Sequence, residues 1–268
     1  MMNETKNLGK EDVALIGLPF DGHSSFMAGP ALAPDKIREA LDSDSSNLYS
    51  EDIVDLISSD NFKDLGNILN INHPKDIIEP INEIIQTGAR CIFLGGDHSL
   101  TYGTVKAISA HTEKFTILHL DAHPDLYDEL DGNKYSHACP FARIMEEGLA
   151  DRLVQVGIRT LNSHQKEQAL KYGVEIIEMR NWSENVAIDL DGPVYLSLDI
   201  DVLDPAFAPG ISHHEPGGCS TRHLINFLQQ QRMDLISADI VEYNPKRDIN
   251  GMTAMVCAKL LKEILAKF

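Results

Sequence analysis

Short, continuous hydrophobic runs alternate with longer segments of helical character along most of the chain. The hydrophobic runs predict buried strands at residues 13–18, 91–94, 115–120, 153–158, 174–177, 194–198 and 235–241. The segments between them predict helices at residues 34–41, 74–87, 100–110, 141–147, 163–172, 221–230 and 252–266. Strands and helices that alternate in this way indicate an α/β fold, with a mostly parallel sheet covered by helices on both faces.

The rest of the sequence gives no sign of a second unit. Residues 41–60 are rich in Asp and Ser, and we interpret most of this segment as a surface excursion. No internal repeat, linker or low-complexity tract divides the chain. Because 268 residues are enough to bury a substantial core, we expect a single domain over residues 1–268.

The charge of the chain narrows the range of partners. Its 23 Lys and Arg residues stand against 41 Asp and Glu residues, a formal net charge of −18. Such a surface repels phosphate backbones and anionic lipids, which argues against nucleic-acid binding and membrane docking. The same balance suits solubility, a cationic ligand, or carboxylates that bind metal ions.

The cysteines and the N-terminal segment bear on the cellular compartment. The four cysteines form no C-x-x-C pair and indicate reduced thiols rather than a disulfide scaffold. Residues 1–12 carry neither an apolar signal core nor an Arg-rich amphipathic pattern. From these two features we expect a cytoplasmic protein.

Metal-binding residue types follow directly after four of the predicted strands. In sheets of this kind, ligands bind at the carboxyl ends of the strands, and in extended backbone residues two apart point to the same side. We therefore expect the side chains at these strand ends to lie together. They are His98, Asp121, His123, Asp125, Asp199, Asp201 and Glu242.

Such a cluster of carboxylates would be strongly repulsive without cations. One catalytic ion would not use six protein ligands, because it needs open positions, whereas two ions could share bridging carboxylates. Oxygen-rich ligands with some imidazole and no thiolate favour Mn²⁺ over Zn²⁺. Each motif alone is also typical of loop acids, helix caps or a packed histidine; their occurrence at successive strand ends is what favours a binuclear centre.

Three of these segments resemble the ureohydrolases, the arginase–agmatinase family. They read GGDHS at residues 95–99, DAHPD at residues 121–125 and SLDIDVLDPAFAPG at residues 197–210. The resemblance extends over residues 13–265, and GNKYSHA at residues 132–138 and GISHHEPGG at residues 210–218 are most similar to plant-type arginases. It implies a three-layer α/β/α arginase-like fold with a central parallel sheet of about eight strands. It also implies two Mn²⁺ ions per chain and a homo-oligomer, a trimer or a hexamer.

The resemblance also implies roles for individual residues. One ion would bind His98, Asp121, Asp125 and Asp199, and the other Asp121, His123, Asp199 and Asp201. Asp125 would orient the attacking nucleophile, Glu242 would pair with the cationic guanidino group, and His137 would relay a proton to the departing amine. Asn133 and Asn162 are candidate contacts for the rest of the substrate. The reaction implied is hydrolysis of L-arginine to L-ornithine and urea.

Several alternatives stay open from the sequence. Residues 159–162 lack the acids with which animal-type arginases bind the substrate amino group, so agmatine or another guanidino or formimino compound is also a candidate substrate. We interpret residues 212–218 as a substrate-facing or intersubunit loop rather than a third metal site. A deacetylase of the same fold would use a single Zn²⁺, and a regulatory pseudoenzyme would be expected to lack some of the ligand positions.

Overall fold

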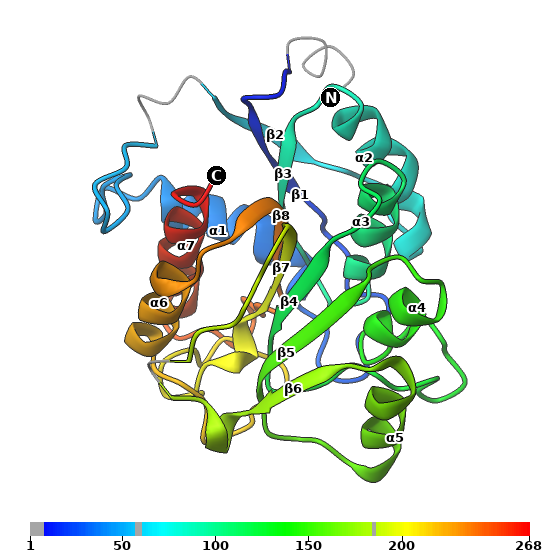
Figure 1. Cartoon of the computed structure of the whole chain (residues 1–268). Coiled ribbons are helices and arrows are strands. Elements are labelled where there is room, and N and C mark those ends of the chain that lie inside the picture. The colour runs from blue at the N-terminus through cyan, green and yellow to red at the C-terminus, as the bar shows by residue number, and fades with distance from the viewer. Residues whose placement is uncertain (1–7, 57–60, 184–185) are drawn as a thin grey trace.

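The computed structural model describes residues 8–56, 61–183 and 186–268. Within these ranges, one eight-stranded parallel sheet runs through the molecule in the strand order β2-β1-β3-β8-β7-β4-β5-β6 (Figure 1). Its strands are β1 Val13–Gly17, β2 Phe62–Asn67, β3 Arg90–Leu94, β4 Thr116–Leu120, β5 Arg152–Ile158, β6 Glu175–Glu178, β7 Pro193–Asp199 and β8 Asp234–Val241.

Helices cover both faces of this sheet. On one face lie α1 (Ala33–Leu41), α6 (Thr221–Gln230) and α7 (Met252–Leu265). On the other lie α2 (Ile78–Ile85), α3 (Leu100–Ser109), α4 (Pro140–Glu146) and α5 (Ser163–Tyr172). The sequence prediction of a three-layer α/β/α architecture is therefore confirmed. Of the helices in the described ranges, none is long and apolar enough to cross a lipid bilayer.

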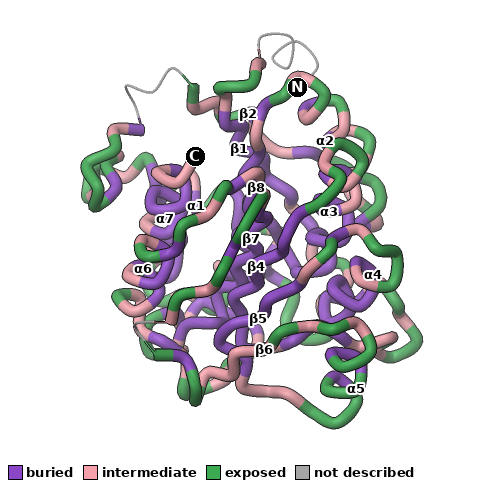
Figure 2. The backbone as a smooth tube through the Cα atoms, in the orientation of Figure 1, coloured by how far each residue is buried: buried purple, intermediate pink, exposed green. Residues whose placement is uncertain are grey.

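Alternation along the strands produces two separate hydrophobic cores. In β4, Leu118 and Leu120 pack in the core under α1, α6 and α7, whereas Ile117 packs in the core under α2 to α5. Successive side chains of a strand point to opposite faces, so a continuously apolar strand serves both cores at once. Apart from residues near their N-terminal ends, the central strands are accordingly buried, as Figure 2 shows.

The predicted elements agree closely with the structure, with one strand missed. All seven predicted strands and all seven predicted helical segments are present, although residues 74–87 divide into a 3₁₀ turn, Pro74–Ile77, and α2. The missed strand, β2, lies at the edge of the sheet, and Leu65 is its only buried residue. Its sequence, FKDLGN, lacks a hydrophobic run because an edge strand has little to bury.

The segment predicted as a surface excursion is largely irregular. Between the end of α1 and residue 56 the backbone forms turns and one isolated bridge, between Tyr49 and Asp55. Residues 57–60 of this prediction, and residues 1–7 of the N-terminal segment, lie outside the described residues. The excursion is tied to α7, where the buried Lys262 ammonium donates to Ser46 Oγ and to the carbonyl of Asn47, both at 2.8 Å.

The strand order places the chemistry-bearing ends side by side. The four strands that are followed by the predicted ligands, β3, β8, β7 and β4, are consecutive neighbours in the sheet. All are parallel, so their carboxyl ends open on the same edge. The topology therefore brings together segments that are more than a hundred residues apart in the chain.

Candidate metal centre

His98, in the turn after β3, is surrounded by carboxylates. Its Nδ1 atom is buried and has no hydrogen-bond partner among the described residues. Three carboxylate oxygens lie within 3.3 Å of this atom, those of Asp121 (3.3 Å), Asp125 (3.1 Å) and Asp199 (3.2 Å). These are four of the predicted metal ligands, and they converge on one point.

The other ring nitrogen of His98 is held by a hydrogen-bonded chain. The Ser197 hydroxyl donates to Asp239 Oδ1 at 2.8 Å, so its oxygen is available to accept from His98 Nε2 at 3.0 Å. With the proton on Nε2, the lone pair of Nδ1 faces the three carboxylates. Metal-ligating histidines are commonly oriented in this way by the group that accepts from their second nitrogen.

A second group of ligands adjoins the first. His123 Nδ1 lies 2.9 Å from Asp201 Oδ2 and 3.4 Å from Asp121 Oδ1. Asp121 thus presents one oxygen to each histidine, which is the arrangement a bridging carboxylate would need. The six predicted ligands are therefore brought together, in two overlapping groups.

The backbone at these ligands differs from the extended form expected from the sequence. Asp201 lies in a short 3₁₀ turn, Ile200–Val202, and its N–H donates to Asp199 Oδ1 at 2.8 Å. Asp125 has a left-handed φ of 47°, a conformation that Asp tolerates better than most residues. The side chains converge because the chain turns sharply, and simple alternation along a strand does not explain the geometry.

The charges of the cluster call for a cation. Burial raises the pKa of Asp199 well above its usual range, and the adjacent Asp201 and Asp121 raise it further. Burial is also the main reason why the pKa of Asp201 is raised to about 6. Burial alone would lower the pKa of His98, but its carboxylate partners outweigh burial and raise it well above the ordinary value. These shifts arise because buried carboxylates lie close together, a cost that divalent cations would remove, so the donor set fits a metal centre.

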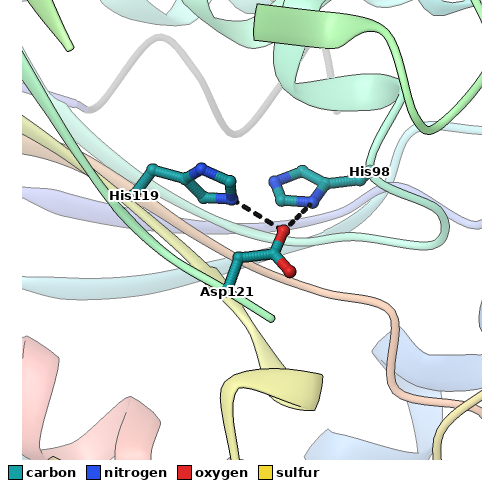
Figure 3. Close-up of side chains that lie close together, drawn as sticks. All are labelled: His98, His119 and Asp121. Atoms are coloured by element: carbon teal, nitrogen blue, oxygen red, sulfur yellow. Dashed lines mark hydrogen bonds and ion pairs between the residues drawn. The ribbon is translucent and has the colours of Figure 1, made fainter. Parts of the chain in front are cut away.

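His119 is a member of the cluster that the sequence reasoning missed. Its Nε2 lies 2.7 Å from Asp121 Oδ2, the same oxygen that faces His98 (Figure 3). The amide nitrogen of Gln155 lies 3.0 Å from His119 Nδ1 and 2.6 Å from the carbonyl of Pro124, so it donates to both. Burial lowers the pKa of His119. A neutral ring that accepts at Nδ1 carries its proton on Nε2 and donates to Asp121.

Glu242 and His137 form an ion pair beside the two groups of predicted ligands. His137 Nδ1 lies 2.9 Å from Glu242 Oε1, which also accepts the backbone N–H of His98 at 2.9 Å. Burial would lower the pKa of His137, but Glu242 outweighs it and raises this pKa to about 9. Glu242 Oε2 is buried and has no hydrogen-bond partner in the part of the chain that the structure describes. It is therefore a carboxylate oxygen that lacks a donor.

Members of both ligand groups and the ion pair line one cavity of about 220 Å³; they are His123, Asp125, Asp199, Asp201, His137 and Glu242. Its outer wall is mostly uncharged and is formed by Ser25, Tyr127, Leu130, Ala138, Thr160, Gln165, His213 and Glu215. Among the described residues, no Lys or Arg lines it. The volume and the acidic floor suit a small cationic molecule.

Two of the predicted substrate contacts lie outside the lining of this cavity. Asn133 Oδ1 accepts the backbone N–H of Tyr135 in a local turn. Asn162 caps the N-terminus of α5, and its Nδ2 contacts the hydroxyl of Tyr127, which does line the cavity. Both side chains have local structural partners, and their contact with substrate stays a prediction.

The loop at residues 212–218 faces the cavity. The ring of His213 lies 5.1 Å from that of His137 and 5.8 Å from that of His123, centroid to centroid. His214 is exposed, and its Nε2 donates to the carbonyl of Pro209 at 3.0 Å. The loop therefore contributes one imidazole to the cavity wall, as expected for a substrate-facing segment.

Comparisons with known proteins agree on one family. Residues 11–266 match the model of the arginase family. The chain is 45% identical to Arginase 1, mitochondrial, of Arabidopsis thaliana over 283 residues, covering 96% of this chain and 81% of that protein. The arginase structure from Medicago truncatula superposes with a TM-score of 0.89 at 43% identity, covering 99% of this chain and 90% of the other. The human Guanidino acid hydrolase, mitochondrial, is 32% identical over 95% of this chain and 77% of its own length.

These relatives overturn one prediction. We expected a cytoplasmic protein, but the similar plant proteins are named as mitochondrial, or as chloroplastic and mitochondrial, arginases. The expectation rested on reduced cysteines and on residues 1–12. It was wrong because subcellular localisation is determined by separate targeting segments and cannot be inferred from the composition of a folded domain.

Proposed function

Because this chain belongs to the arginase family, we propose that it hydrolyses L-arginine to L-ornithine and urea. The observation that carries the proposal is a cavity lined by carboxylates of two adjoining histidine–carboxylate groups and by Glu242, which has a buried oxygen without a donor among the described residues. The first feature suits a pair of divalent ions and the second suits a planar cation. A guanidino compound is the substrate class that uses both.

We assign two Mn²⁺ ions to the clustered ligands. His98, Asp121, Asp125 and Asp199 would hold one ion, and Asp121, His123, Asp199 and Asp201 the other. Manganese is chosen over zinc because the donors are mainly carboxylate oxygens, with no thiolate among them. When bound, two such ions lower the pKa of a shared water and so supply a nucleophile for the guanidinium carbon.

The residues around the ions would orient the substrate and manage protons. Glu242 Oε2 would accept N–H groups of the guanidinium, which fixes the position of the carbon as well as neutralising the charge. Asp125 would hold the attacking water by a hydrogen bond. His137, whose pKa Glu242 raises to about 9 in the metal-free protein, would give a proton to the departing amine.

Agmatine is the second candidate substrate, and one observation favours it. It lacks the carboxylate of arginine, and among the described residues no Lys or Arg lines the cavity to receive a carboxylate. Against this, neutral donors such as the hydroxyl of Tyr127 and the amide of Gln165 lie on the outer wall. We favour arginine because the relatives quoted above at 43–45% identity are named arginases.

We also propose that the chain is a single domain that assembles as a trimer or a hexamer. The support is the resemblance to the family, and several large hydrophobic side chains are exposed, among them Phe26, Phe207 and Ile249. Sedimentation equilibrium should give a mass three or six times that of one chain, whereas a monomer would exclude the assembly.

One substrate comparison tests the proposed activity. The Mn²⁺-loaded protein is incubated with arginine, agmatine, guanidinobutyrate or formiminoglutamate, and kcat/KM is measured for each. We expect arginine to give the highest value, with urea as a product. A higher value for agmatine would replace the substrate and leave the reaction type intact, and no turnover of any of the four would exclude the activity.

A further inference from the structure

Arg159 follows β5 directly, and its guanidinium joins two other segments at the same edge of the sheet. It donates to three successive backbone carbonyls, those of Asp201 (2.7 Å), Val202 (3.3 Å) and Leu203 (3.3 Å). It also donates twice to the carbonyl of Glu215, from Nε at 2.9 Å and from Nη2 at 2.6 Å. One side chain thus holds the turn that carries Asp201 and the loop that carries His213.

The backbone of the same segment holds a third part of the site. The N–H groups of Arg159 and Thr160 donate to the carbonyl of Ala122 at 2.9 and 3.3 Å, and the Thr160 hydroxyl donates to it at 3.0 Å. In turn, the N–H of Ala122 donates to Asp201 Oδ1 at 3.1 Å. Residues 159–160 therefore contact the segments that supply Asp121, His123 and Asp201.

The two segments that the guanidinium holds also pack tightly against each other. Leu203 and Cys219 form an isolated bridge, and the N–H of Gly217 donates to Asp204 Oδ2 at 2.6 Å. A Cβ on Gly218 would lie 2.5 Å from the backbone nitrogen of Asp204, so only glycine permits this approach. A small shift of one segment is thereby transmitted to the other.

Arginine is the side chain suited to this position. Its five N–H donors lie in one plane, and it keeps its charge at any pH of interest. It can therefore reach carbonyls of two separate segments at once. A lysine carries three donors on a single nitrogen atom and would satisfy one cluster of carbonyls at the expense of the other.

We infer that Arg159 is a positioning residue of the metal centre: it fixes the turn at residues 200–202 so that the Asp201 carboxylate stays within reach of His123. Arg159 is not among the predicted ligands, and its guanidinium bonds described above are all to backbone carbonyls. The inference rests on the proposed function, because it presumes that these two side chains hold the second ion. Groups that orient metal ligands typically contribute ten- to hundredfold to affinity.

The test compares Mn²⁺ binding by the wild-type protein, Arg159→Lys and a matched control. Arg152→Lys is the control, since Arg152 begins the same strand but pairs with Glu175 at the surface, away from the cavity. Each protein is stripped of metal and titrated with Mn²⁺, with bound metal measured by elemental analysis. For Arg159→Lys we expect one ion to bind as in the wild-type protein and the other ten- to hundredfold more weakly. Arg152→Lys should bind both ions normally.

The melting temperature of the metal-free proteins separates positioning from general support of the fold. If Arg159→Lys melts lower but binds both ions with wild-type affinity, the inference is overturned. If Arg159→Lys does not fold, Arg159→Gln, which keeps a planar pair of N–H donors, is titrated in its place with the same criteria.

The proposed function fails separately from this inference. If the wild-type protein binds two ions but releases no urea, the proposed activity is excluded, and the Mn²⁺ titration still decides the role of Arg159. Wild-type protein that binds no Mn²⁺ would overturn both.

Discussion

Glu242→Gln isolates the proposed interaction with the guanidinium. In the native protein Oε1 accepts the backbone N–H of His98, so a glutamine would keep its own oxygen there. Its NH₂ group would then replace Oε2, the oxygen that has no donor among the described residues. The substrate N–H groups would meet N–H groups instead of a carboxylate, and the negative charge would be lost.

The size of the effect follows from the burial of this group, which is 4% exposed. Breaking a buried, hydrogen-bonded charge pair by altering one partner costs roughly 2–5 kcal/mol. Two charge-assisted hydrogen bonds at about 1.5–3 kcal/mol each give a similar total. At about 1.4 kcal/mol per factor of ten, a loss of about 3–4 kcal/mol lowers kcat/KM by roughly 10²- to 10³-fold.

The assay is kcat/KM for urea release from arginine, with bound manganese measured on the same samples. Glu178→Gln is the control, because Glu178 ends β6 and pairs with Arg180 outside the cavity. We expect Glu242→Gln to keep both ions and lose activity, and the control to match the wild-type protein. A Glu242→Gln variant within threefold of the wild-type kcat/KM would refute the assigned role, as would an equal loss in the control.

Four further predictions concern metal, protons and stability. Asp201→Ala should lower the bound manganese from two ions to one per chain by elemental analysis, and two retained ions would exclude it as a ligand. His137→Asn should lower kcat by about 10²- to 10⁴-fold with its metal content intact, and an unchanged kcat would rule out the proton relay. In metal-free protein, an NMR titration should give His137 a pKa of about 9, above its ordinary 6.5. The ion pair with Glu242 then stabilises the fold fully below pH 6.5, and this stabilisation is lost as the pH rises through 9. An unshifted pKa of His137 would contradict the pairing. Gly96→Ala would place a Cβ 1.7 Å from the Phe20 carbonyl oxygen and should lower the free energy of unfolding by about 3 kcal/mol or more. In Gly132→Ala the Cβ meets no atom within 4 Å, and only the left-handed φ of 76° costs free energy, about 1 kcal/mol; similar melting temperatures for the two variants would refute the clash.

The layered fold was predictable because its buried strands carry local signals. A short run such as residues 91–94 is apolar on both faces, and this pattern is typical of a strand in a parallel sheet that helices cover on both sides. The edge strand β2 has no comparable signal, since Leu65 is its only fully buried residue. Its pairing with β1 depends on the partner strand rather than on its own composition.

The convergence of the predicted ligands on one edge of the sheet was predictable for a related reason. Parallel strands end on one edge of the sheet, so the residues that follow neighbouring strands lie close together. Asp, His and Glu directly after several buried strands are therefore recognisable as candidate ligands. The sequence did not reveal the backbone turn at Asp201, because two Asp residues separated by one residue, Asp199 and Asp201, are compatible with both an extended strand and a 3₁₀ turn.

Supporting residues escaped the sequence reasoning because their partners are distant in the chain. His119 lies inside a strand predicted as apolar, and its bond to Gln155 spans 36 residues. The only available signal was a histidine two positions before Asp121. Arg159 contacts the carbonyl of Glu215 across 56 residues, and no local pattern marks such a contact. Asn162 illustrates a different difficulty: it caps α5, and because a helix cap and a substrate contact use the same residue type, its contact with substrate stays a prediction.

The most direct test of the account is the product balance from L-arginine. The Mn²⁺-loaded protein should release urea and L-ornithine in equal amounts, lose this activity when a chelator removes the metal, and regain it when Mn²⁺ is restored. Urea release that persists in fully stripped protein, or fully loaded protein that forms neither product, would contradict a two-ion arginine hydrolase.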